Sequence, residues 1–285
     1  MAYEIINNAQ INPQRLYALL RVVIANPGIE EDKIYSLLQP KPLNNNQKAA
    51  EVLLDSAVKT ELIYGDIHKR YKSKILSEEI ETYAMFRALM QKRLLGVVDD
   101  NSDNYLLNLF IAWCAVKNAE ILSKSSSLSD MAVDFNKTLF PESEIRALNT
   151  TKLGGIDDWM IFLGHGWKLN NYFLMPDASI RLESLLADLL PSPEEIPLAE
   201  FMNKLSDQCP ELDRGILFEK CWQAVYGNKP HSNQLSLMLS TGLRSLQKKQ
   251  KIRLIYLPDA RDTWMLYPDM FDPRVTHIAS VRKTV

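Results

Sequence analysis

The amino-acid sequence predicts a mainly helical protein that carries small β-hairpins. Apolar residues recur at helical spacing in several segments, as they do between Leu16 and Ile24. A short aromatic sequence that ends in Pro-Asp occurs twice, as Asn-Tyr-Phe-Leu-Met-Pro-Asp at 171–177 and as Thr-Trp-Met-Leu-Tyr-Pro-Asp at 263–269. Alternating large apolar residues are typical of half-buried strands. The repetition indicates duplicated architecture.

The first 76 residues predict three helices followed by a hairpin. Asn12 and Pro13 are typical of a helix start, and Asn26-Pro27-Gly28 ends that helix. Apolar spacing then predicts two more helices, and Gly65-Asp66 is typical of a hairpin turn. The elements expected after the first helix are helices over 30–38 and 44–60, a strand over 62–64, a turn at 65–66 and a basic returning arm over 67–75.

The middle of the chain predicts a helical connector and a second hairpin. Helices over 79–95 and 105–122 are separated by an acidic turn. After the serines at 125–127, the expected elements are helices over 129–139 and 142–153, a strand over 159–163, a turn at Gly164-His165-Gly166 and a strand over 167–174. We expect Gly154-Gly155 to form a loop before the first strand.

Proline residues at 191, 193 and 197 predict a linker, after which a further unit begins. A helix over 178–190 precedes the linker. The elements expected after it are helices over 198–206, 213–226 and 232–250, strands over 252–257 and 263–267, and a partly ordered basic tail over 271–285.

Helices followed by a two-stranded hairpin resemble the winged-helix family. The resemblance covers 1–76 and 198–270, and a winged-helix-like unit covers 126–190. The predicted architecture is therefore tandem winged-helix domains joined by a helical connector over 77–125, with a tail over 271–285. In this family the third helix usually enters the DNA major groove and the hairpin contacts phosphate or the minor groove.

Composition and charge exclude several classes of protein. The 285 residues carry a net charge of -2, so any attraction to nucleic acid must be local. The longest apolar run, 105–116, is too short to span a bilayer, and no basic region followed by an apolar one opens the chain. Cys114, Cys209 and Cys221 lie in helix-like apolar surroundings typical of reduced thiols. We expect a cytoplasmic protein that does not enter the membrane.

Two cation-rich segments are the candidate DNA-binding residues. Between Arg244 and Arg253 there is no acid, and a second cluster surrounds Tyr71. Amide and hydroxyl groups suit base edges, an arginine suits guanine, and the remaining cations suit phosphates. The alternative is a solvated basic helix end that relieves the helix dipole. The candidates are Asn233, Gln234, Ser236 and Thr241 for base edges, Arg244 for guanine, Lys248, Lys249, Lys251 and Arg253 for phosphates, and His68, Lys69, Arg70, Lys72 and Lys74 in the first hairpin.

Signatures of catalysis and cofactor binding are missing from the sequence. There is no phosphate-binding Gly-x-x-x-x-Gly-Lys, no Gly-x-Gly-x-x-Gly and no Gly-x-Ser-x-Gly motif. The four histidines are scattered, and Asp157-Asp158 has no other ligand nearby in the sequence. His165 is the only histidine in a permissive turn, and one histidine does not make a site. The sequence predicts no enzymatic activity, no cofactor and no metal.

The overall layout and the two Leu-x-Pro-Asp endings resemble the G component of the bacterial deazapurine-in-DNA (Dpd) systems. This resemblance implies an adaptor subunit of a defence or DNA-modification system, with double-stranded DNA and a larger protein as partners. Glu51 and Asp55 on the third helix instead favour a protein-interaction scaffold without DNA contact. A third hypothesis is a transcription regulator that forms a homodimer through the helices at 79–122.

Overall fold

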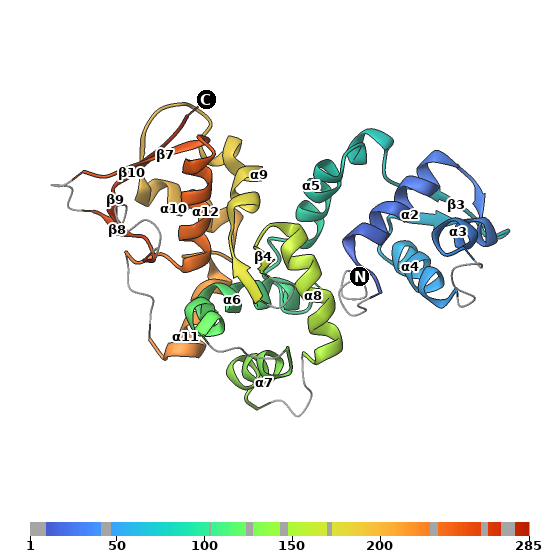
Figure 1. Ribbon diagram of the computed structural model, residues 1–285, viewed down its shortest axis with the longest axis horizontal. Helices are drawn as coiled ribbons and strands as arrows, with labels where there is room; N and C mark the ends of the chain where they lie inside the picture. Colours follow the sequence, from blue (N-terminus) through green and yellow to red (C-terminus); the bar gives the residue numbers. More distant parts are fainter. Residues whose placement is uncertain are drawn as a thin grey trace.

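The computed structural model describes residues 10–40, 47–102, 104–123, 128–142, 148–169, 173–228, 233–257, 262–268 and 277–284. The protein is mainly helical with small antiparallel sheets, so the predicted fold class is confirmed. Figure 1 shows a small N-terminal unit at one end, a C-terminal sheet at the other, and helices between them. Predictions for the segments between these ranges, including residues 170–172 of the strand predicted over 167–174, lie outside the described residues. Among the described residues, no helix is long and apolar enough to cross a membrane.

Local sequence signals define the N-terminal unit. Asn12 caps its first helix, because its side chain accepts a hydrogen bond of 2.9 Å from the backbone N–H of Arg15. Leu16, Leu20 and Val23 are fully buried against the helices that follow. The elements of this unit are α2 (Pro13–Ala25), β1 (Ile29–Glu30), α3 (Glu31–Leu38), α4 (Lys48–Lys59), β2 (Ile63–Gly65) and β3 (Arg70–Ser73).

The strands of the N-terminal unit form one antiparallel sheet in the order β1-β3-β2. The hairpin of β2 and β3 places Tyr64 opposite Lys72. On the other side of β3, Ile29 of β1 lies opposite Tyr71. The sequence predicted the hairpin and not β1, because a strand of two residues has no alternation that could be recognised.

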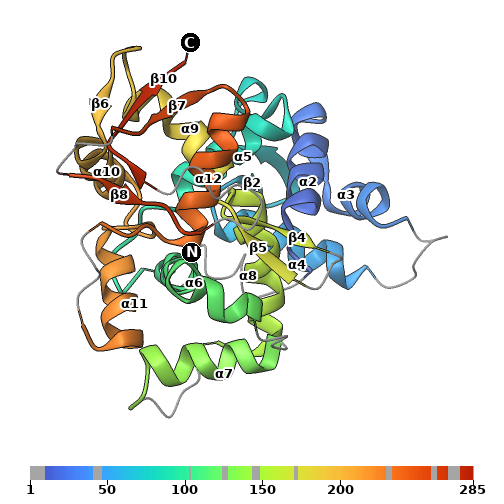
Figure 2. The same cartoon turned by 60° about the vertical axis from the view of Figure 1, so that its left-hand side comes forward.

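The middle of the chain wraps around one buried helix. Its elements are η1 (Ser77–Ile80), α5 (Tyr83–Leu94), α6 (Tyr105–Ser123), α7 (Leu128–Leu139), α8 (Thr150–Leu163), β4 (Gly166–Leu169) and β5 (Phe173–Pro176). Helix α6 contacts α8, β5 and two C-terminal helices, and its Leu107, Ile111 and Trp113 are fully buried. Figure 2 shows α6 enclosed by these elements. The predicted connector segment therefore contributes a central part of the core.

The strand predicted over 159–163 is wrong. These residues form the last turns of α8, which starts at the cap residue Asn149 and runs through Gly154-Gly155 without the predicted loop. Leu153, Ile156 and Trp159 are buried at helical spacing. The run Trp-Met-Ile-Phe-Leu has no polar residue, so its sequence could not distinguish a strand from a helix. The hairpin that follows pairs Gly166–Leu169 with Phe173–Pro176.

Contacts between α8 and the N-terminal unit join the two parts of the molecule. The indole N–H of Trp159 donates a buried hydrogen bond of 2.9 Å to the backbone oxygen of Ile11, which precedes α2. Phe162 of α8 packs against Phe86 and Tyr83 of α5, and Tyr17 of α2 joins the same aromatic cluster. The N-terminal unit is therefore fastened to the rest of the chain by core contacts.

The C-terminal strands pair differently from the prediction. The elements are α9 (Ser179–Leu189), β6 (Ile196–Pro197), α10 (Leu198–Gln208), α11 (Ile216–Tyr226), α12 (Leu237–Lys248), β7 (Ile252–Ile255), β8 (Trp264–Met265), β9 (His277–Ile278) and β10 (Ser280–Lys283). β7 pairs with β10 in the sheet β6-β10-β7, and β8 pairs with β9. The predicted hairpin of 252–257 with 263–267 is wrong. Strand β10 lies in the predicted tail, and Val281 is fully buried.

Helix α9, which precedes the predicted linker, packs against α12 and α10. The backbone N–H of Ala178 donates a hydrogen bond of 3.2 Å to the oxygen of Met238 on α12. Gly242 of α12 allows this approach, because a Cβ at that position would lie 3.0 Å from the backbone of Ala178. Helix α9 is therefore an integral part of the C-terminal packing, while the predicted domain boundaries stay a prediction.

Candidate nucleic-acid interface

Helix α12 starts at a buried cap. Both carboxylate oxygens of Asp213 accept hydrogen bonds of 2.6 Å, one from the backbone N–H of Ser236 and one from its hydroxyl. The Ser236 oxygen in turn accepts from the backbone N–H of Leu239 at 3.2 Å. Ser236, which was a candidate for base contact, is therefore buried as the cap of the helix. Burial raises the pKa of Asp213 to about 6, although the hydrogen bonds from Ser236 lower it.

We expect the Asp213→Asn variant to lose one component of the pH dependence of stability. The folded-state pKa lies above the unfolded one, so Asp213 supports folding most below pH ~4, and that contribution is lost as the pH rises to about 6. The asparagine variant lacks this loss. Its free energy of unfolding, relative to the wild type, should therefore rise by roughly 2.5 kcal/mol between pH 4 and 7. Urea unfolding across this range measures the difference, with exposed Asp188→Asn as the control. Parallel pH profiles for Asp213→Asn and wild type would contradict it.

The segment before α12 lies along β8. The amide of Asn233 donates a hydrogen bond of 3.0 Å to the oxygen of Thr263, and Gln234 forms a parallel bridge with Met265. Both side chains remain exposed. The helix predicted from residue 232 or 233 instead begins at Leu237. Asn233 and Gln234 therefore lie beside a strand and not on the helix.

Three of the candidate residues share one face of α12. Thr241, Arg244 and Lys248 recur at spacings of three and four residues. Arg244 Nη1 donates a hydrogen bond of 2.8 Å to the backbone oxygen of Tyr267, whose N–H donates to Ser240 at the same distance. The segment after β8 thus covers the middle of this face, and Lys248 at its end is exposed.

The remaining C-terminal cations gather where α12 passes into β7. Lys249 Nζ lies 3.1 Å from one carboxylate oxygen of Glu183 on α9, and Lys251 Nζ lies 3.5 Å from the other. One acid therefore balances two lysines. Lys248 and Arg253 are exposed and form no ion pair with a residue that the structure describes. This corner keeps an excess of positive charge. We call the group of Lys248, Lys249, Lys251 and Arg253 the basic corner.

The cations of the N-terminal hairpin are largely neutralised by acids of the same unit. Glu31 accepts hydrogen bonds of 2.8 Å from Lys69 Nζ and from the Tyr71 hydroxyl. The bond from Lys69 lowers the pKa of Glu31 in spite of its partial burial. Arg70 Nε lies 3.0 Å from Asp66. Lys72 is exposed on β3.

Helix α4 and the end of the N-terminal hairpin repeat this pattern. Lys74 Nζ lies 3.9 Å from Glu61, and on α4 Lys59 Nζ lies 2.9 Å from Asp55. Glu51 is exposed on the same helix. This end of the molecule therefore offers less unbalanced positive charge than the basic corner.

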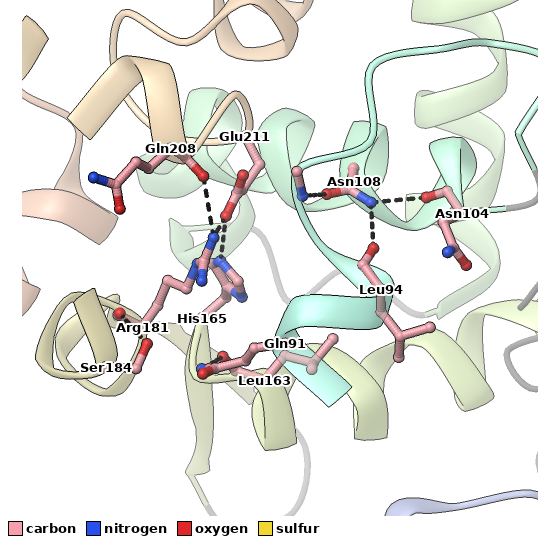
Figure 3. A network of polar contacts seen from close by, with 11 residues as sticks. Gln91, Leu94, Asn104, Asn108, Leu163, His165, Arg181, Ser184, Gln208 and Glu211 are labelled. Atoms are coloured by element: carbon pink, nitrogen blue, oxygen red, sulfur yellow. Dashed lines mark hydrogen bonds and ion pairs between the residues drawn. The ribbon is translucent and has the colours of Figure 1, made fainter. Parts of the chain in front are cut away.

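A buried cluster of three charged or titratable residues holds the β4–β5 hairpin against the C-terminal helices (Figure 3). His165 Nε2 lies 3.2 Å from Glu211 Oε1, which also accepts a bond of 3.3 Å from Arg181 Nε. Burial lowers the pKa of His165, while the bond from His165 and the charge of Arg181 keep the pKa of Glu211 below its ordinary value. The cluster therefore contains a neutral histidine, an anion and a cation. The sequence placed His165 in a permissive turn, and the structure places it in the short turn between α8 and β4, with its side chain fully buried.

Polar side chains near this cluster join the middle helices. Asn108 of α6 donates bonds of 2.8 Å to the backbone oxygens of Leu94 and Asn104, and it accepts from the N–H of Gly96. Gln91 of α5 donates a bond of 2.8 Å to the oxygen of Leu163 at the end of α8. Figure 3 shows these contacts beside Glu211. They are structural contacts that fix α5, α6 and α8 to one another.

Asp157 and Asp158 hold a lysine. Lys168 Nζ on β4 lies 2.8 Å from Asp157 and 3.1 Å from Asp158. Burial raises the pKa of Asp157, against the hydrogen bond from Lys168. Over the described ranges, no group of three histidine, cysteine or acidic side chains is placed to hold a metal ion.

Comparison with models of protein families finds a match over most of the sequence. A family model described as DpdG-like matches residues 3–260. The chain belongs to the DpdG-like family. Membership of the DpdG-like family indicates a component of a multi-subunit Dpd-type system, and it confirms the likeness drawn from the Leu-x-Pro-Asp endings. No match was found among curated proteins or among solved structures.

The DpdG-like match includes all the candidate DNA-binding residues, from His68 to Arg253. It ends before β9 and β10, so the strand that completes the C-terminal sheet lies beyond the matched range. The sequence did not single out Arg282 on this strand. The sequence carries no clear strand signal there, because the buried Ile278 and Val281 are three residues apart and do not alternate with period two.

Proposed function

We propose that this chain is a non-catalytic subunit of a Dpd-type system that contacts the backbone of double-stranded DNA through the basic corner and a larger protein through its N-terminal unit. Membership of the DpdG-like family supports a role in a Dpd-type system. The cations are less neutralised at the basic corner than in the N-terminal unit, which supports DNA contact at the first and protein contact at the second. The main observation in favour of DNA contact is that Lys248 and Arg253 are exposed and have no ion-pair partner in the described part of the chain. Phosphates are the natural partners for such cations.

We also propose that both terminal units are winged helices. In the N-terminal unit the elements follow the order α2, β1, α3, α4, β2, β3, and the sheet order is β1-β3-β2. In the C-terminal unit the same order is supplied by α9, β6, α10, α12, β7 and β10, with the sheet β6-β10-β7. Helix α11 and the β8–β9 pair are then insertions. On this proposal the C-terminal unit starts at α9 and not at residue 198.

The correspondence makes α12 the equivalent of α4, and both are third helices of their units. On α4, Glu51 and Asp55 face solvent, whereas the exposed end of α12 carries Lys248 and Lys249. Acids on α4 oppose a phosphate backbone, and lysines on α12 attract one. Helix α12 is therefore a better candidate than α4 for contact with DNA. Because Arg244 already bonds to the backbone of Tyr267, we assign the basic corner to phosphates and not to base edges.

Reversing the charges of the basic corner tests this function. We expect the Lys248→Glu, Lys249→Glu, Lys251→Glu variant to bind duplex DNA more weakly, with a salt dependence shallower by about one unit of slope per lost contact. Fluorescence anisotropy over a salt series measures both quantities. The Glu183→Gln variant is the matched control, because it frees Lys249 and Lys251 and should bind more tightly. DNA binding that is absent in the wild type at low salt, or unchanged in the triple variant, would contradict the proposal.

Contact with a partner protein is favoured by the surface of the N-terminal unit. Ile67, at the tip of the β2–β3 hairpin, is 93% exposed, and Leu37 on α3 is 47% exposed. Apolar side chains beside balanced ion pairs are typical of protein interfaces. A scaffold without DNA contact is therefore the second candidate function. Co-purification with proteins encoded beside this one tests it, and the absence of any retained protein would contradict it.

The transcription-regulator hypothesis depended on a dimerising helix within 79–122. Leu109 and Phe110 of α6 are buried against other elements of the same chain. These apolar side chains are therefore used inside the molecule. We do not favour a homodimer through this helix.

A further inference from the structure

Strand β10 brings a second arginine to the basic corner. It lies between β6 and β7, and its Arg282 is directly opposite Arg253 of β7. Ile252, Leu254 and Val281 of these two strands are buried, so the alternating positions of the two arginines face away from the core. Figures 1 and 2 both show β7 and β10 side by side.

The pairing of two arginines is unfavourable by itself. Like charges directly opposite each other on neighbouring strands repel and destabilise a sheet. Neither Arg253 nor Arg282 forms an ion pair with any residue in the described ranges. Glu195 directly precedes β6, whose Ile196 lies opposite Val281, and its carboxylate accepts a hydrogen bond from the Ser280 hydroxyl. This neighbouring acid is therefore hydrogen-bonded to Ser280 and forms no ion pair with either arginine among the described residues.

An anion between the two guanidinium groups would remove the repulsion. Directly opposite residues hold their Cβ atoms about 4.5–5.5 Å apart, which lets two side chains of this length reach one group. Arginine donates paired hydrogen bonds that match the oxygens of phosphate. Lys251 directly precedes β7, and Lys248 lies at the end of α12. The arginine pair thus extends the row of cations onto the sheet.

We propose that Arg253 and Arg282 together bind one phosphate group of the DNA backbone, an inference that rests on the proposed function. Neither the lysines of α12 nor the helix itself is needed to form this site. Because the two arginines come from different strands, the site exists only when β10 is paired with β7. The residue that completes it comes from the segment that the sequence assigned to a tail.

Substitution of Arg282 gives two effects of opposite direction. Arg282→Glu places an acid opposite Arg253, so we expect its thermal unfolding midpoint to rise while its affinity for duplex DNA falls by about tenfold. A variant that merely disturbs the fold would lower both. Arg93→Glu is the matched control, because it makes the same charge change at an exposed position on helix α5, which is not part of the C-terminal sheet. Glu195→Gln should bind DNA more tightly than the wild type.

The measurement is fluorescence anisotropy with duplex DNA over a salt series, combined with thermal unfolding of each variant. The site is supported if the wild type binds DNA and Arg282→Glu binds it more weakly and with a shallower salt dependence. Arg93→Glu should bind as the wild type does. Equal binding by wild type and Arg282→Glu would overturn the arginine site and leave the DNA-binding function intact. Loss of binding by Arg282→Glu with a lowered unfolding midpoint would also overturn it. No wild-type binding at low salt would overturn the site together with the function.

Discussion

The Glu211→Gln variant should unfold far more readily than the wild type. Glu211 is fully buried and is the only anion in the cluster with His165 and Arg181, so its neutralisation leaves the Arg181 guanidinium buried without a counter-charge. Breaking a buried ion pair by removing one partner costs about 3–5 kcal/mol. We expect a loss of this size in the free energy of unfolding, measured by urea denaturation at pH 7.

Two comparisons separate this effect from the general cost of the substitution. Glu200→Gln removes the partner of Lys204 in an exposed pair of 2.8 Å on α10, and it should change stability by less than about 0.5 kcal/mol. The double variant Glu211→Leu, Arg181→Met removes both charges, and it should recover much of the loss. A Glu211→Gln variant as stable as Glu200→Gln would show that the buried cluster does not hold the hairpin.

The Gly164→Ala variant should also be strongly destabilised. Gly164 ends α8 with a φ of 94°, in the left-handed region that alanine enters at a cost. A Cβ there would lie 2.8 Å from the backbone nitrogen of Arg181 and from Cβ of Ile180, both at the start of α9. Backbone strain and overpacking together should cost about 2–5 kcal/mol. Thermal and urea unfolding measure the loss.

A second glycine provides the matched control for Gly164. Gly227 ends α11 with a φ of 70°, but a Cβ there would meet nothing within 4 Å. Gly227→Ala should therefore cost about 1 kcal/mol, from the backbone alone. Equal losses in the two variants would mean that the approach of α9 to the end of α8 is not tight.

The parts of the fold that the sequence predicted correctly depend on local signals. Asn12 and Pro13 begin α2, and the helices α5, α6 and α9 lie within a few residues of their predicted bounds. Each of these elements carries its own caps or apolar spacing. The first hairpin was predicted for the same reason, since Gly65-Asp66 marks the end of its first strand, although Gly65 itself pairs with Tyr71 and the turn covers 66–69.

Long-range pairing was beyond the reach of the sequence. The partner of β7 is β10, although β8 lies nearer in the chain and has the stronger aromatic pattern. His165, Arg181 and Glu211 come from three separate segments, so no local motif announces their cluster. The one local feature at this cluster is the glycine on each side of His165, where a Cβ would lie within 3 Å of neighbouring segments. The candidate DNA-binding residues were chosen from the local density of cations in the sequence. Which of these cations are neutralised depends on acids from distant segments, such as Glu31 for Lys69 and Glu183 for Lys249.

The hydrogen bond from Trp159 to Ile11 has a consequence for how two ligands would act on the protein together. With the N-terminal unit fastened to α8, the proposed protein site and the proposed DNA site are kept at a fixed separation. A partner protein that itself binds DNA would then meet the DNA at a raised effective concentration, without any change of shape. Weak affinity at each end can then suffice for tight assembly, provided that the spacing of the two sites matches the complex.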